Sequence, residues 1–144
     1  MQAEIQDNNT PPTPIVARRV AEHQRLQTLP EHFGRRMMQV EALVYQYMRE
    51  LSRTYRGGYW HFYDLSNGGF YMAPSDDAQV LIHVEGNDYE GSLSADAAGI
   101  VVSLFALCQL SAQYQSRTFA DHYHWLRDFA LDHAECRAIF AAID

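Results

Sequence analysis

The amino-acid sequence predicts an α+β fold, in which a small antiparallel β-meander of three to four strands is flanked by about four to five helices. Residues 35–53 and 95–132 carry apolar side chains at helical spacing, whereas residues 59–93 form short strand-like runs separated by turns that contain glycine. Because the connections between these runs are short, neighbouring strands are expected to pair in antiparallel fashion.

The 144 residues are enough for one domain. Residues 1–14 are polar, contain three prolines and show no periodicity, so we predict a disordered N-terminal tail followed by a single domain of residues 15–144. A weak helical pattern runs from Ile15 to Leu29 and is predicted to end before Pro30, because the residue before a proline is disfavoured in a helix. Residues 29–34 are predicted to form a turn.

The clearest predicted helix covers residues 35–53 and is followed by Gly57 and Gly58. Its apolar side chains share one face at 100° per residue: Met37, Val40, Val44, Tyr47, Met48 and Leu51. Glu41 projects from within this apolar stripe, and a carboxylate there is seldom fully buried unless it is paired. We therefore expect Glu41 to have a partner.

Four strands are predicted after this helix. An aromatic-rich run at 59–65 and a second run at 70–72 flank an Asn67-Gly68 step, which is the strongest short-range signal of a β-hairpin. Residues 79–85 alternate as a third strand, and Gly86 and Asn87 turn the chain into a fourth at 88–93.

The C-terminal third is predicted to be helical. Ser94 is suited to cap a helix over 95–114, which is apolar nearly all round and is therefore expected to be buried. Thr118 and Asp121 suggest a loose capping pair for a helix ending at Asp132, and a last helix is predicted over 134–143.

The two cysteines, Cys108 and Cys136, both lie within helical patterns, which argues against a disulfide framework and favours a reducing, cytoplasmic location. Cys108 is expected to be a small core residue. The first fourteen residues do not follow the pattern of a signal peptide, and we expect no membrane span.

The formal net charge is −7, and residues 61–116 contain seven acidic residues and neither Arg nor Lys. Such a balance argues against a general nucleic-acid-binding protein, which needs clustered basic residues. It leaves open a basic protein partner or an acidic surface that imitates DNA.

Motifs for catalysis are missing from the sequence, which has neither a phosphate-binding glycine loop nor a Gly-x-Ser-x-Gly motif. None of the seven histidines has metal-ligand spacing, and His122 and His124 would point to different sides of a helix. We therefore expect no catalytic residues, no cofactor and no metal.

Four runs resemble the antirestriction protein family of ArdB and KlcA. The longest is GGYWHFYDLSNGGFYMAP at 57–74, and the others are LPEHFGR at 29–35, LSADAAGIV at 93–101 and AIFAAID at 138–144. The resemblance covers about residues 22–144.

This resemblance implies an antirestriction protein of plasmids and mobile elements that protects incoming plasmid or phage DNA from type I restriction endonucleases, without known catalytic activity. The implied partner is the type I restriction-modification complex or a host factor that it requires, with no direct nucleic-acid binding. The family positions linked to activity correspond to Arg25, Glu41 and Trp60. The alternative is an acidic DNA mimic, which we rank second because the carboxylates are interspersed with aromatic residues rather than arranged in rows.

Two expectations concern these three residues. Arg25 is a candidate to hold Glu41 through a charge-assisted hydrogen bond, either as a structural pair or as part of a contact site. Trp60 shares a strand face with Phe62 and the charged Asp64, which suggests that its edge reaches water; the alternative is a core tryptophan packed between sheet and helix.

Overall fold

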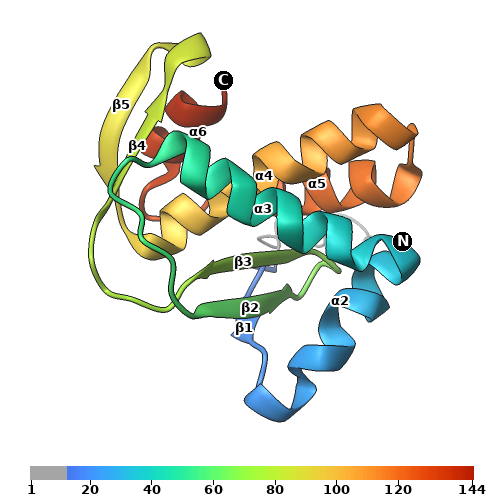
Figure 1. Ribbon diagram of the computed structural model, residues 1–144. Coiled ribbons are helices and arrows are strands. Elements are labelled where there is room, and N and C mark those ends of the chain that lie inside the picture. The colour runs from blue at the N-terminus through green and yellow to red at the C-terminus, as the bar shows by residue number, and fades with distance from the viewer. Residues whose placement is uncertain (1–12) are drawn as a thin grey trace, which may run out of the picture.

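Helix α4 (Ala95–Tyr114) passes through the middle of the molecule, where it contacts both sheets and the helices α3, α5 and α6 (Figure 1). This computed structural model describes residues 13–144. The predicted tail of residues 1–14 therefore lies, except for its last two residues, outside the described residues. The architecture is α+β with antiparallel strands, as the sequence predicts.

A three-stranded sheet has the order β1-β2-β3 and consists of β1 (Ala17–Arg19), β2 (Trp60–Leu65) and β3 (Phe70–Pro74). Trp60 pairs with Pro74 and Asp64 with Phe70, so β2 and β3 form the predicted hairpin. Its turn depends on Gly68, which has a φ of 99° and donates its backbone N–H to the carbonyl of Leu65.

A separate two-stranded sheet consists of β4 (Val80–Val84) and β5 (Tyr89–Leu93), joined by a 3-10 turn, η3 (Glu85–Asn87). The third and fourth predicted strands are therefore present and antiparallel. They form their own sheet instead of continuing the first one, and residues 75–79 connect β3 to β4 close to the start of α4.

The predicted helix over Ile15–Leu29 is wrong in its first two thirds. Its place is taken by β1 and a 3-10 turn, η1 (Glu22–Gln24), because pairing with β2 satisfies the backbone of residues 17–19. The predicted turn at 29–34 is also wrong: α2 (Arg25–Phe33) contains Pro30 and ends just before Gly34, whose φ is 56°. Pro30 is exposed, and the neighbouring Leu29 and Phe33 are buried, so packing compensates for the missing hydrogen bond.

The remaining helices largely follow the predictions. After the 3-10 turn η2 (Gly34–Arg36), α3 (Met37–Leu51) buries the predicted face at Val40, Val44 and Met48. Two more helices follow α4: α5 (Arg117–Ala130) and α6 (Cys136–Ile143). The N-cap of α5 is Ser116 rather than the predicted Thr118–Asp121 pair, because the Ser116 side chain accepts from the backbone N–H of Phe119.

Helix α4 begins at the predicted cap, where the Ser94 hydroxyl accepts from the backbone N–H of Ala97. By length and composition alone α4 could cross a membrane, but 67% of its apolar stretch is buried inside the fold.

The expectation for Cys108 is wrong, because its side chain lies on the solvent side of this helix and is exposed; Cys136 is half-buried, and both cysteines are free.

Candidate functional site

Arg25 is the first residue of α2 and anchors this helix to β2. Its Nη1 donates a 2.7 Å hydrogen bond to the backbone carbonyl of Trp60. The guanidinium also lies 4.6 Å from the ring centre of Tyr59 and 4.2 Å from that of Phe62. A cation held between two aromatic faces and a carbonyl is strongly oriented, so α2 is fixed at its N-terminus.

Glu41 is half-buried on α3, and its partner is the hydroxyl of Tyr45, which donates a 3.0 Å hydrogen bond to Oε2. The predicted ion pair with Arg25 is not among the salt bridges of residues 13–144. The reason is local: Tyr45 lies one helical turn after Glu41, while Arg25 is engaged by Trp60 and the two rings. Burial, and next the negative charge of Glu41, raise the pKa of Tyr45 well above its ordinary value.

Trp60 is only 2% exposed, so the core interpretation of this residue is confirmed and the expectation that its edge reaches water is wrong. Its Nε1 donates a 2.7 Å hydrogen bond to the hydroxyl of Tyr55. The Trp60 face of β2 turns inward, and the opposite face, with Tyr59 and His61, is the more exposed one.

The structure nevertheless brings the three predicted residues together. Tyr45 packs edge-to-face against Trp60, with ring centres 5.1 Å apart, while its hydroxyl holds Glu41. The Trp60 carbonyl in turn holds Arg25. Sequence reasoning missed Tyr45 and Tyr55, although the spacing of four residues between Glu41 and Tyr45 on one helix was a usable signal.

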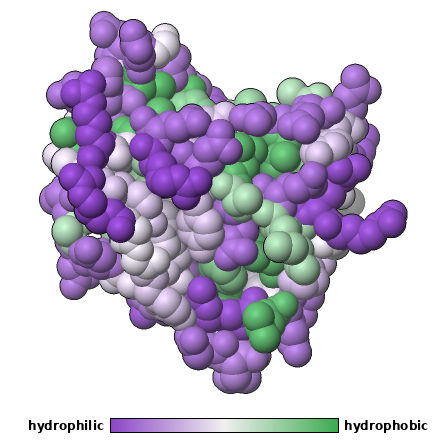
Figure 2. Space-filling model, viewed as in Figure 1, coloured by the Kyte–Doolittle hydropathy of each residue, from purple (hydrophilic) through white to green (hydrophobic). Residues whose placement is uncertain are grey.

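Arg25 and Glu41 border a mainly apolar hollow of about 200 Å³ between α2 and α3. The hollow is lined by Arg25, Leu26, Leu29, Pro30, Met37, Met38, Glu41 and Phe62. Leu26 is 92% exposed and Met38 71% exposed. Figure 2 shows apolar residues gathered on the surface over α2 and the start of α3. We call this surface, defined by the eight lining residues, the α2–α3 hollow.

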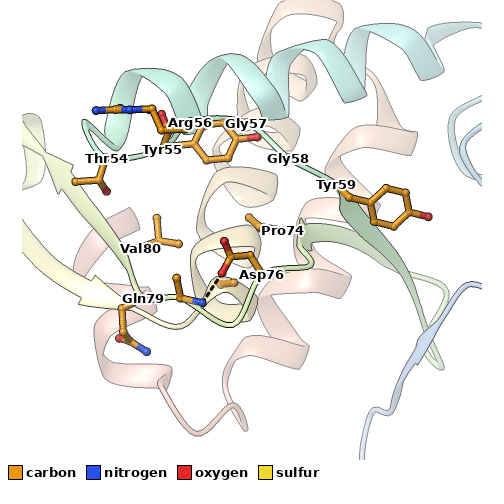
Figure 3. A pocket seen from close by; sticks show the side chains of 12 residues that line it. Thr54, Tyr55, Arg56, Gly57, Gly58, Tyr59, Pro74, Asp76, Gln79 and Val80 are labelled. Atoms are coloured by element: carbon orange, nitrogen blue, oxygen red, sulfur yellow. Dashed lines mark hydrogen bonds between the residues drawn. The ribbon is translucent and has the colours of Figure 1, made fainter.

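A second hollow, of about 260 Å³, lies on the other side of the loop that precedes β2 (Figure 3). It is lined by residues 54–59, by parts of the β3–β4 connection and by Ala95, and the side chain of Tyr59 points away from it. Its polar groups support the backbone: Arg56 donates to the carbonyls of Arg53 and Tyr55, and Asp76 accepts from the N–H of Ala78. The Arg56 and Asp76 side chains therefore stabilise the two loops, and neither is free to act as an acid or base on a ligand.

A third set of polar groups joins α4 to the segment before α6. Asp96 accepts hydrogen bonds from the hydroxyl of Tyr71 at 2.7 Å and from Nε2 of His133 at 2.8 Å. Burial opposes ionisation of Asp96, but these two hydrogen bonds outweigh it and lower the pKa of the carboxyl.

Within residues 13–144 no three His, Cys, Asp or Glu side chains are grouped as metal ligands.

Comparison with known proteins places this chain in a family. Residues 53–144 match the family described as antirestriction protein. Over 140 residues the chain is 55% identical to the antirestriction protein KlcA of Escherichia coli, covering 92% of this chain and 96% of the relative. The chain therefore belongs to the antirestriction protein family, which confirms the resemblance found in the sequence.

Two further relatives support this membership. Another Escherichia coli KlcA is 52% identical over 141 residues, covering 94% of this chain and 99% of the relative. A solved structure of the KlcA and ArdB proteins superposes with a TM-score of 0.86 at 53% identity and covers 94% of this chain and 99% of that chain. Those proteins show a novel fold and antirestriction activity against type I DNA restriction systems in vivo but not in vitro.

Proposed function

We propose that this protein is a cytoplasmic antirestriction protein that protects incoming plasmid or phage DNA from type I restriction endonucleases. The observation that carries the proposal is the relationship to KlcA, at 55% identity over almost the whole of both chains. The activity of the structural relatives against type I systems in vivo agrees with it. The family is one of restriction inhibitors rather than of known enzymes, so we infer that the protein acts by binding.

The partner is a protein: either the type I restriction-modification complex or a host factor that the complex requires. A relative that is active in vivo but not in vitro supports a route through a further component of the cell. The net charge of −7 argues against direct nucleic-acid binding, because phosphate contacts need clustered cations.

We place the contact at the α2–α3 hollow. An apolar side chain of the partner would enter between Leu26 and Met38, which are too exposed to contribute to the core. Arg25 and Glu41 provide one charge of each sign at the border of this apolar surface, an arrangement that favours specific orientation. Trp60 is buried, so its contribution is to hold Arg25 and Tyr45 in place.

The second candidate is DNA mimicry, which the base-free segment 61–116 favours. Against it, several acidic side chains accept hydrogen bonds within the fold and are unavailable as phosphate substitutes. These are Asp64, Asp96 and Glu135.

The test is the plating of unmodified phage on cells that carry a type I restriction system and express this protein. We expect plating to rise, with no such rise on cells that carry a type II system. Leu26→Asp and Met38→Asp should abolish protection. Leu131→Asp is the matched control, because Leu131 is a 58% exposed leucine on another part of the surface, at the end of α5.

Capture of bound proteins from the same cells separates the mechanisms. Restriction subunits that are released by added DNA would support mimicry, whereas a host protein lost on Leu26→Asp would support the α2–α3 hollow. Unchanged plating at confirmed expression would reject the function altogether.

A further inference from the structure

His32 and His122 form the centre of a continuous hydrogen-bonded chain that crosses three elements. Nδ1 of His32 lies 3.0 Å from Nε2 of His122, and Nε2 of His32 lies 2.8 Å from Oδ1 of Asp64. At the other end, Nδ1 of His122 lies 2.9 Å from the backbone carbonyl of Thr118. The chain thus joins β2, α2 and α5, and it contributes nothing to the α2–α3 hollow.

The hydrogen-bonded chain needs a definite number of ring protons, which follows from its acceptors. The Thr118 carbonyl and the Asp64 carboxylate can only accept, so each requires an N–H from the ring that faces it. The contact between the rings requires one more N–H, because two lone pairs 3.0 Å apart repel each other. Three N–H groups are therefore needed on four ring nitrogens, whereas two neutral imidazoles have only two.

We infer that His32 and His122 bind one excess proton between them, so that the half-buried ring of His32 and the buried ring of His122 form an imidazolium–imidazole pair next to the Asp64 carboxylate. In this arrangement His32 donates from both nitrogens. His122 accepts at Nε2 and donates from Nδ1 to Thr118. All three contacts are then hydrogen bonds with a proton between donor and acceptor.

Charged groups on three elements face the pair, and they act on this distribution in both directions. Arg18 donates to the other oxygen of Asp64 at 3.0 Å, so both oxygens of this group accept hydrogen bonds and the excess proton is assigned to a ring. The doubly protonated ring is His32, because this ring faces the Asp64 carboxylate; the lowered pKa of His122, caused by burial, agrees with this. Asp121 on α5 attracts a proton to His122, while Arg35 and Arg36 on η2 border the adjacent hollow with His32 and oppose the positive charge.

Aromatic rings enclose the pair and restrict water. His122 is 5% exposed, and the ring centres of Phe33 and Trp125 lie 4.6 and 5.0 Å from it. The ring of Phe70 lies 5.2 Å from that of His32. Because an ionised donor strengthens a hydrogen bond in such surroundings, the bound proton fixes the C-terminal end of α2 to β2 and α5.

Nuclear magnetic resonance of the ring nitrogens in the ¹⁵N-labelled full chain tests the inference. At pH 7.0 we expect three of the four ring nitrogens of His32 and His122 to carry a proton, with His122 protonated at Nδ1 only. The exposed His23 and His124 provide internal references for the chemical shifts. Two protonated nitrogens, or four, in the wild-type protein would overturn the inference without any variant being made.

Asp64→Asn is the decisive variant, because it removes the need for the third proton and preserves the chain of hydrogen bonds. Arg18 donates to the oxygen of the new amide, so its NH₂ faces Nε2 of His32, which then accepts. We expect the count to fall from three protonated nitrogens to two. Asp121→Asn removes an equal charge near His122 from a residue outside the hydrogen-bonded chain. This variant should keep three protonated nitrogens. Three protons in Asp64→Asn would also overturn the inference.

Discussion

Glu41 and Tyr45 are joined by a hydrogen bond within α3, and the ring of Tyr45 leans edge-on against Trp60. The carboxylate that interrupts the apolar face of this helix is therefore held by a neutral hydroxyl rather than by an arginine. A half-buried carboxylate with one such partner and access to water costs the fold little. Glu41 is consequently available for an external contact.

The first prediction is that Glu41→Gln and Tyr45→Phe each lower the free energy of unfolding by only about 1 kcal/mol, as expected for one partly exposed hydrogen bond. Urea unfolding of both variants measures this. We expect Glu41→Gln to lose protection against type I restriction while it remains folded. A loss of about 3 kcal/mol or more would instead indicate a buried charge pair that the substitution breaks.

Trp60 should behave as a core residue. Trp60→Ala is expected to lower the free energy of unfolding by about 3–5 kcal/mol, because it leaves a large cavity between β2 and α3. Tyr55→Phe, which removes only the acceptor of the indole N–H, should cost about 1–3 kcal/mol. A Trp60→Ala protein as stable as the wild type in urea would contradict the observed burial.

Gly99 allows α4 to approach β3 closely. A Cβ at this position would lie 2.5 Å from the carbonyl oxygen of Met72 and 2.4 Å from the Cβ of Ala73, so backbone would have to move. Gly99→Ala should therefore lower the free energy of unfolding by about 1–3 kcal/mol or more, despite the higher helix propensity of alanine. Gly86→Ala is the control, since no atom lies within 4 Å of its added Cβ. Equal thermal stability of the two variants would refute the steric explanation.

Acid stability should depend on Asp96. Its hydrogen bonds from His133 and Tyr71 overcome burial and lower the pKa of the carboxyl in the folded state. The unfolded chain then binds a proton more readily than the folded chain. The contribution of Asp96 is therefore present above the ordinary carboxyl pKa of about 3.9 and is lost as the pH falls through the lower folded-state value.

Thermal unfolding between pH 2 and pH 6 provides the measurement for Asp96. The wild-type protein should lose more stability on acidification than Asp96→Asn does. Asp132→Asn, which changes an exposed carboxylate in the segment between α5 and α6, should follow the wild-type profile. Parallel profiles for the wild type and Asp96→Asn would contradict the prediction.

Local signals in the sequence account for the elements that were predicted well. Ser94 identifies the start of α4, and Asn67-Gly68 identifies the hairpin, because caps and tight turns depend on a few neighbouring residues. The exposure of Cys108 was missed because a helix that is apolar nearly all round gives no sign of which side reaches water.

Long-range contacts explain the other errors. Residues 17–19 form a strand only because β2 lies beside them, and β2 begins at Trp60, far along the chain. The expectation that the edge of Trp60 reaches water rests on Asp64, a charged residue on the same strand face. In the structure Arg18 and His32 bind Asp64 near the end of the strand, and Trp60 stays buried. The contact between His32 and His122 spans 90 residues and leaves no periodic trace in the sequence. The family resemblance points to Arg25, Glu41 and Trp60 as a set, and Glu41 also stands out in the sequence as a carboxylate within an apolar stripe. Tyr45, which connects the three, was missed.

The central position of α4 determines when the chain can fold during its synthesis. Both sheets and three other helices contact α4, so β3, β4 and β5 lack the surface that this helix provides until it has left the ribosome. A growing chain that stops before residue 95 leaves Tyr71, Met72 and Ala73 of β3 without their contacts to α4. Because unpaired strands with exposed aromatic residues aggregate readily, translation without interruption through α4 is a requirement for a soluble product.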